Sequence, residues 1–176
     1  PNINFGNMPA DGGKLLFTIE EKNEFIEKEP LSEKWFKQLL SAQEFINGKE
    51  RWCLWLEDIK KEELEKLPLV KERVDELRII RQNSSRPQLA EIPHLFAQIT
   101  QPKDKDFILI PKTSSENRKY IPIGILDPSI ITSGSALIIP NANLYFFGII
   151  MTNIIIIVPR RINNLPNLLR SSKIKT

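Results

Sequence analysis

Six polar or charged side chains with the chemistry to read nucleic-acid bases stand close together between two apolar runs. They are Lys112, Ser114, Ser115, Glu116, Arg118 and Lys119. Arginine and lysine donate paired hydrogen bonds to guanine, glutamate accepts from the cytosine amino group, and hydroxyls bind phosphates. The pattern predicts a loop that contacts DNA. A solvated hairpin loop is the alternative, and composition alone favours it.

A second polar turn follows a later apolar run and contains Asn141, Asn143 and Tyr145. The two amides match the donor and acceptor on an adenine edge, although the same residues suit a plain turn. Both polar segments connect apolar runs of strand length. We therefore expect them to lie together at one end of a sheet, flanking or entering the major groove.

The net charge of +3 is unevenly distributed along the chain. Residues 1–76 contain 12 Lys or Arg against 17 Asp or Glu, whereas residues 77–176 contain 13 against 5. The basic second half suits a polyanion, because each cation placed on a phosphate releases counterions. Arg73, Arg78 and Arg81, expected largely off the apolar stripe of one helix, are further candidate DNA contacts. Ordinary scatter of charge explains the balance equally well.

Catalytic signatures are missing from the sequence. It has no glycine-rich phosphate loop, no H-E-x-x-H, no G-x-S-x-G and no paired C-x-x-C. Cys53 and His94 are the only residues of their types, so neither a zinc finger nor a Cys–His pair is expected. His94 fits a packing role better than that of a general base. We expect no catalytic residue, metal or cofactor in this chain.

The remaining sequence features concern size and location. At 176 residues the chain is long enough for about one domain. No signal peptide is visible, and the apolar stretch 144–158 is shorter than the ~20 residues that span a bilayer. These features predict a cytoplasmic piece of a longer protein with no membrane partner.

The apolar spacing predicts an α+β fold, with helices mainly in the first half and a mixed or antiparallel sheet with recognition loops in the second. A capping box of Thr18 and Glu21 starts a helix that ends near Lys28, and Pro68 starts another with Val70, Val74 and Leu77 on one face. The other expected elements are helices at 33–40 and from Asp58 to 66, a buried strand at 51–56, and strands at 107–110, 120–125, 136–139 and 144–150.

Four sequence blocks occur in order along the chain: GNMPADGGKL at 6–15, EFING with RWCLWL at 44–56, PKTSSENRKYIPIG at 111–124, and IPNANLYFFG at 139–148. Together they resemble a family of bacterial adenine-specific DNA methyltransferases that includes restriction–modification enzymes of the MmeI kind. The resemblance implies a target recognition domain, whose partners are double-stranded DNA and an upstream methyltransferase domain that uses S-adenosylmethionine. It implies a linker at 1–17, the recognition domain at 18–150, and an atypical tail at 151–176.

One departure from the family follows Gly148. The family continues there with a histidine, a tryptophan–arginine pair and a G-R-L element, whereas this chain has an isoleucine run. The departure leaves an inactive remnant of a disrupted gene as one alternative to DNA recognition. A non-catalytic spacer or docking module, with its polar loops merely solvated, is another.

Overall fold

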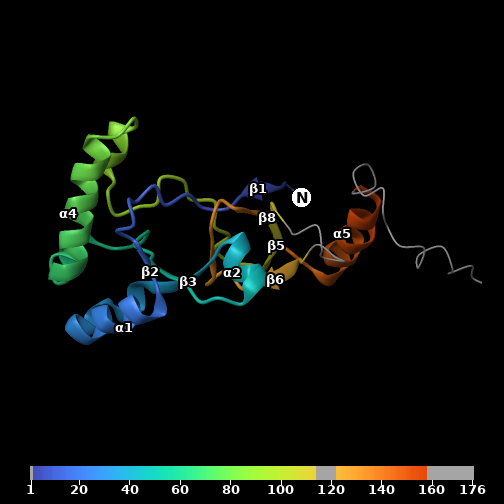
Figure 1. The fold of residues 1–176 in the computed structure, drawn as a ribbon, viewed down its shortest axis with the longest axis horizontal. Helices are drawn as coiled ribbons and strands as arrows, with labels where there is room; N and C mark the ends of the chain where they lie inside the picture. The colour runs from blue at the N-terminus through green and yellow to red at the C-terminus, as the bar shows by residue number, and fades with distance from the viewer. Residues whose placement is uncertain (1, 114–121, 158–176) are drawn as a thin grey trace, which may run out of the picture. The chain divides into compact units, whose positions relative to one another are not determined.

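The structure is a computed structural model that describes residues 2–113 and 122–157 (Figure 1). The chain divides into two compact units, Pro1–Ala142 and Asn143–Thr176. The first unit contains two four-stranded sheets, four α-helices and two 3-10 helices among its described residues. The second contains α5 (Leu144–Ile157). The α+β class predicted from the sequence is confirmed.

Two helices begin where the sequence predicts. α1 (Ile19–Lys28) starts at Thr18, whose hydroxyl accepts from the Glu21 N–H while the Glu21 carboxylate accepts from the Thr18 N–H. α4 (Pro68–Gln82) has Pro68 in its first turn. The first-turn N–H groups of Leu69 and Val70 have no partner within the helix. They donate instead to the buried carboxylate of Glu29, about forty residues earlier, at 2.9 and 3.2 Å. The end of α1 therefore fixes the start of α4.

Two predicted elements are wrong. Residues 33–40 do not form one helix, because a 3-10 helix η1 (Pro30–Trp35) is followed by strand β3 (Phe36–Leu40). Residues 144–150 do not form a strand, because they belong to α5. Short apolar runs suit either structure, and their spacing alone does not decide between them.

Three further helical segments differ from the expectation or were missed. α2 (Ala42–Asn47) begins at a capping box of Ser41 and Glu44 and ends at Gly48, whose φ of +63° suits glycine. α3 (Lys61–Leu64) begins after Lys60, so Asp58 does not cap it. A second 3-10 helix, η2 (Pro87–Glu91), follows α4.

The first sheet has the strand order β2-β4-β3-β7. β2 (Leu16–Phe17) and β3 pair antiparallel with β4 (Trp52–Leu54), and β3 pairs in parallel with β7 (Ile131–Thr132). The buried strand predicted at 51–56 is confirmed as β4. This sheet joins strands from both ends of the first unit.

The second sheet is antiparallel throughout, with the order β1-β8-β5-β6. Its strands are β1 (Asn4–Phe5), β5 (Phe107–Pro111), β6 (Gly124–Leu126) and β8 (Ala136–Pro140). β1 and β2 are strands of the two sheets, so the segment expected as a linker contributes one strand to each of them.

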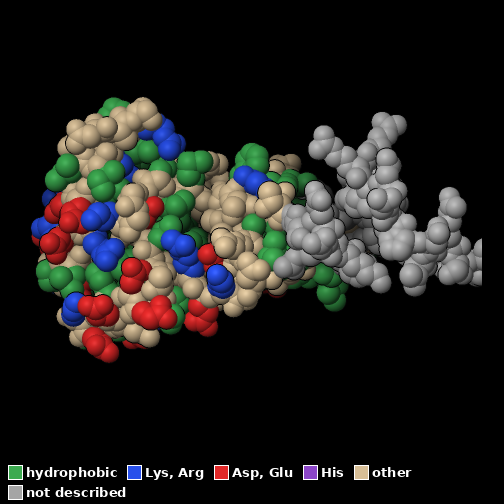
Figure 2. All heavy atoms as spheres, viewed as in Figure 1, with side chains coloured by type: hydrophobic (Ala, Val, Ile, Leu, Met, Phe, Trp, Pro, Cys, Tyr) green, Lys and Arg blue, Asp and Glu red, His purple; other side chains and the backbone are tan. Residues whose placement is uncertain are grey.

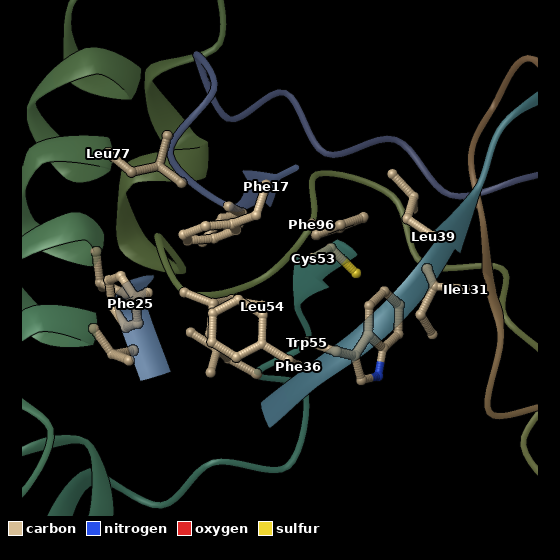
Figure 3. Packing of buried hydrophobic residues seen from close by; sticks show 14 of the residues in the cluster. Phe17, Phe25, Phe36, Leu39, Cys53, Leu54, Trp55, Leu77, Phe96 and Ile131 are labelled. Carbon is tan, nitrogen blue, oxygen red and sulfur yellow. The ribbon is translucent and has the colours of Figure 1, made fainter. Parts of the chain in front are cut away.

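A large hydrophobic core packs the first sheet against α1 and α4 (Figure 3). Phe17, Phe25 and Phe36 meet edge to face, with ring centroids between 4.9 and 5.7 Å apart. Trp55 meets Phe96 in the same way at 5.1 Å. Cys53 lies in this core, and burial raises the pKa of its thiol far above the ordinary value.

The second sheet packs against α2 through a smaller core (Figure 1). The buried members are Leu40, Phe107, Leu109, Ala136 and Ile138. The ring of Phe45 also packs here, and a Cβ on Gly124 would stand 2.8 Å from it. Glycine at position 124 therefore lets α2 approach β6 closely.

Candidate nucleic-acid interface

Lys112 lies at the end of the second sheet where β5 finishes and β8 begins. Pro111 pairs with Ala136, and the Lys112 N–H donates to the Ser135 carbonyl at 3.2 Å. The exposed ammonium of Lys112 stands 4.1 Å from the ring centroid of Phe5. The other members of the predicted recognition loop lie outside the described residues: Ser114, Ser115, Glu116, Arg118 and Lys119.

Asn141 lies at the opposite end of the same strand pair. Pro140 pairs with Phe107, and the Ala142 N–H donates to the Asp106 carbonyl at 2.7 Å. The two polar segments therefore leave opposite ends of a five-residue antiparallel pair, about 13 Å apart at ~3.3 Å per residue. The expectation that both segments share one end of a sheet is wrong.

Asn143 and Tyr145 belong to the second unit. The Asn143 side-chain oxygen accepts from the Phe146 N–H at 2.8 Å, close to the start of α5. Tyr145 is 72% exposed, and its ring meets that of Phe146 edge to face at 5.8 Å. Both side chains are accessible to a partner, although the amide of Asn143 also serves its own turn.

The three arginines predicted as DNA contacts on α4 differ in exposure. Arg78 is exposed and pairs with Asp75 at 2.7 Å. Arg73 is half-buried, donates to the Lys14 carbonyl at 2.9 Å and stacks 4.3 Å from the centre of the Phe17 ring. Burial lowers the pKa of the Arg73 guanidinium. Of the three, only Arg78 is exposed, with 48% of its side-chain surface accessible to solvent.

Arg81 has a structural role, contrary to its prediction as a DNA contact. It is 2% exposed and lies on the buried face of α4 with Val74 and Leu77. Its guanidinium donates to backbone carbonyls of two segments, those of Pro9, Ala10, Leu89, Ile92, Pro93 and Leu95. These bonds occupy the donors that a phosphate would need, so we remove Arg81 from the candidate interface.

Comparison with known proteins assigns the chain to a family. Residues 1–162 match the family described as "MmeI, target recognition domain". The chain belongs to the MmeI target recognition domain family. It is 40% identical over 155 residues to DNA methyltransferase A of Bacillus subtilis (strain 168), covering 86% of this chain and 18% of that protein.

A solved structure supports the same family. The structure of the Type IIL restriction–modification enzyme MmeI in complex with DNA matches with a TM-score of 0.82 and 45% sequence identity, covering 86% of this chain and 20% of that chain. The chain thus spans about a fifth of the length of the relatives that it matches.

The first block shared with the MmeI-like family, residues 6–15, has a structural function that the sequence reasoning missed. A Cβ on Gly6 would stand 2.2 Å from the Ser133 carbonyl oxygen, so only glycine fits this contact. Asn7 is fully buried, and its side chain bonds to Gln101, Thr132 and Thr100 at 2.7–2.9 Å. The block therefore fastens the start of the chain to β7.

The rest of the block closes a turn. The Asp11 carboxylate accepts from the Leu15 N–H at 2.8 Å, and Gly12 and Gly13 have φ of +57° and +83°. A cleft of about 470 Å³ adjoins this turn. Its charged lining residues balance one another: Lys14, Lys28, Arg73, Glu21, Glu72 and Glu76. A cleft without excess charge does not favour a phosphate.

The described residues show no arrangement suited to catalysis by a bound metal. Within residues 2–113 and 122–157, no group of three or more His, Cys, Asp or Glu side chains is placed to hold an ion. His94 is half-buried, and burial, with the nearby charges of Arg81 and Arg78, lowers its pKa. Among the described residues, none of the helices has the length and apolar character that a membrane span requires.

Acidic and basic side chains are interspersed on the face of the helical part shown in Figure 2. Several of the cations are neutralised by close carboxylates, as Lys14 is by Glu76 at 2.6 Å and Lys103 by Glu57 at 2.6 Å. Among the described residues, this face therefore carries no broad basic surface.

Proposed function

We propose that this chain is the DNA target recognition domain of a bacterial, adenine-specific DNA methyltransferase or restriction–modification enzyme. The observation that carries the proposal is the match, at a TM-score of 0.82 and 45% identity, to MmeI in complex with DNA. At that identity the loops that follow the shared strands are expected to have the same task. The parent protein is a cytoplasmic enzyme, and its partner is double-stranded DNA.

The division of labour within the parent follows from the chemistry of adenine. The amino group of adenine is inaccessible in a stacked duplex, so a methyltransferase extrudes the base and needs a second module that holds the duplex in register. In this proposal, S-adenosylmethionine and the catalytic residues belong to the upstream methyltransferase domain. The present chain contributes recognition alone.

The proposed DNA contacts are those of the 112–119 loop, with two accessory groups. Glu116 accepts from a cytosine amino group and Arg118 donates to guanine, while Lys112, Ser114, Ser115 and Lys119 hold phosphates. The accessory contacts include Asn141, at the other end of the sheet, and Asn143 and Tyr145 of the second unit. Arg73 and Arg78 are accessory cations on α4.

Fluorescence anisotropy of the chain with a labelled duplex tests the proposal. Affinity is expected to fall as salt rises, with a log–log slope of about −0.9 for each phosphate contact. Absence of binding at low salt, or an affinity independent of salt, would contradict a role in DNA recognition and favour a spacer or docking module.

A methyl-transfer assay tests the division of labour. The chain alone is expected to incorporate no labelled methyl group into DNA, while the intact parent does so at its site. Methyl incorporation by the chain alone would show that catalysis is not confined to the upstream domain.

A further inference from the structure

Two serine hydroxyls lie beside Lys112 at the end of the second sheet where β5 finishes. Ser133 and Ser135 belong to the turn between β7 and β8, and their Oγ atoms are 2.9 Å apart. Ser135 is bonded through its carbonyl to the Lys112 N–H. Lys112 and the two serines thus belong to the same end of the sheet, joined there by a backbone hydrogen bond, with Lys112 and Ser135 exposed and Ser133 partly buried.

Among the described residues, one hydroxyl proton of this serine pair has no acceptor. The Ser135 Oγ accepts from the Ala42 N–H at 2.9 Å, which uses one of its lone pairs. The two serines hold two hydroxyl protons between them, and the bond that joins them uses one. The second proton remains for another acceptor. A ligand with an oxygen acceptor satisfies it.

The turn that carries these serines is fixed before any ligand arrives. The Ser133 N–H donates to the Leu40 carbonyl at 3.0 Å, and the Gly134 N–H donates to the Asn7 carbonyl at 2.7 Å. With the bond from the Lys112 N–H to the Ser135 carbonyl, three separate segments therefore hold the turn. Little conformational entropy remains to be lost when its hydroxyls bind a ligand.

The charge at this edge favours an anion. No carboxylate of the described residues lies within salt-bridge distance of the Lys112 ammonium, which rests over the Phe5 ring. The Glu44 carboxylate lies near this turn, because it bonds to Ser41, the neighbour of the Ala42 that bonds to Ser135. That carboxylate caps α2 and has the Arg51 guanidinium at 4.0 Å. Lys112 is therefore a cation available to an external anion.

The opposite end of the same strands has the reverse charge. One residue beyond the pair of Phe107 and Leu126, the two strands continue into the exposed residues Asp106 and Asp127. Hydrogen bonds from Ser129 lower the pKa of Asp127, so its carboxylate is ionised at neutral pH. The two carboxylates outnumber the neighbouring cation Lys105, so a phosphate is less favoured at this end than at the other.

We propose that Lys112, Ser133 and Ser135 form a binding site for one phosphate of the DNA backbone, which directs this end of the β5–β8 pair toward the duplex. The inference rests on the proposed function and adds to it two serines outside the predicted recognition loop. It also assigns an orientation, because the Asn141 end then faces away from the bound phosphate.

Matched substitutions at the two ends test the site in the full chain. Lys112→Gln removes a cation at the proposed end, and Lys105→Gln removes an exposed cation at the other. Ser133→Ala removes a hydroxyl at the proposed end, and Ser129→Ala removes an exposed one at the other. Binding of a labelled duplex of random sequence is followed by anisotropy over a range of salt, with circular dichroism as the check on folding.

Lys112→Gln is expected to reduce the log–log salt slope by about 1, while Lys105→Gln leaves it unchanged. Ser133→Ala is expected to lower affinity several-fold at every salt concentration without changing the slope, because a hydroxyl releases no counterion, and Ser129→Ala is expected to change neither. Equal slopes for the two lysine variants, or full affinity for Ser133→Ala, would overturn the site while leaving DNA binding intact. Absence of binding by the unsubstituted chain would overturn both the site and the proposed function.

Discussion

The two sheets of the first unit have four strands each, and they differ in what covers them. The sheet β2-β4-β3-β7 packs on two long helices through a cluster of fifteen buried side chains among the described residues. The sheet β1-β8-β5-β6 packs on the short helix α2 through a cluster of five. The predicted recognition segments start from the second sheet, at Lys112 and Asn141.

We call the sheet β2-β4-β3-β7 with α1 and α4 the frame, and the sheet β1-β8-β5-β6 with α2 the platform. Strongly packed elements resist deformation, whereas segments that must adapt to a partner are placed on loops held by such elements. The bonds of Asn7 and the contact of Gly6 with Ser133 join the platform to the frame. Substitutions in the frame are therefore expected to change stability, and substitutions on the platform edge are expected to change DNA binding.

Removing a frame aromatic is expected to have the largest effect. Trp55 is 7% exposed and packs on Phe96, so Trp55→Ala is expected to lower the free energy of unfolding by about 3–5 kcal/mol. Trp52→Ala is expected to cost less, because Trp52 is only partly buried and lies beneath Lys22. Urea melts measure both losses. A loss below about 0.5 kcal/mol for Trp55→Ala would show that the frame does not depend on this core.

Removing the buried guanidinium is the next largest change. Arg81→Met leaves several carbonyls without a donor, each at a cost of about 1–3 kcal/mol unless water reaches it, so we expect a total loss of about 2–4 kcal/mol. Arg78→Met, one turn away and exposed, is the control and is expected to leave the unfolding free energy nearly unchanged. Equal free energies of unfolding for the two variants would show that the Arg81 hydrogen bonds do not stabilise the fold.

Changing the recognition loop is expected to act on specificity rather than on stability. Exchange of Glu116 or Arg118 in the intact parent should change the preferred base at one position, by about 1–3 kcal/mol of discrimination. Sequencing of the methylated sites measures the change, and a denaturant melt checks that the frame is intact. An unchanged site with uniformly weaker activity would reassign these residues to phosphate contacts or structural supports.

The smallest effect is expected at the acidic end of the platform. Asn141 has a φ of +58°, so Asn141→Gly deletes the amide while keeping the backbone conformation. Its effect on DNA affinity is expected to be smaller than that of Lys112→Gln, because the neighbouring Asp106 and Asp127 repel phosphates. A larger loss for Asn141→Gly in the same anisotropy assay would reverse the assignment of the two ends.

Much of the frame could be predicted from local sequence signals. The capping box at Thr18 and the proline at position 68 mark two helix starts, because both signals act within one turn. The strand 36–40 could not be predicted in this way, since its structure is decided by pairing with β4 and with β7, about ninety residues later. Tertiary pairing overrides local preference in such runs.

The candidate site was less accessible to sequence reasoning. Arg81 follows Val70, Val74 and Leu77 at helical spacing, so its place on the buried face was a signal present in the sequence. The separation of Lys112 from Asn141 required the antiparallel pairing of β5 with β8, which no local pattern specifies. The sequence around Ser133 and Ser135 does not predict their proposed role as phosphate ligands. That role depends on contacts of Ser135 with Lys112 and Ala42, which are distant in the chain.

The pairing of β1 with β8 also sets the order in which the polypeptide can fold during its synthesis. Asn4 pairs with Ile138, so the first strand has no partner in the first unit until the ribosome has made nearly all of that unit. β2, β4 and β3 are complete by residue 54 and can pair early. Long-range strand pairings form slowly and leave strand edges exposed meanwhile. β8, the last described strand of the first unit, therefore determines when that nascent unit closes.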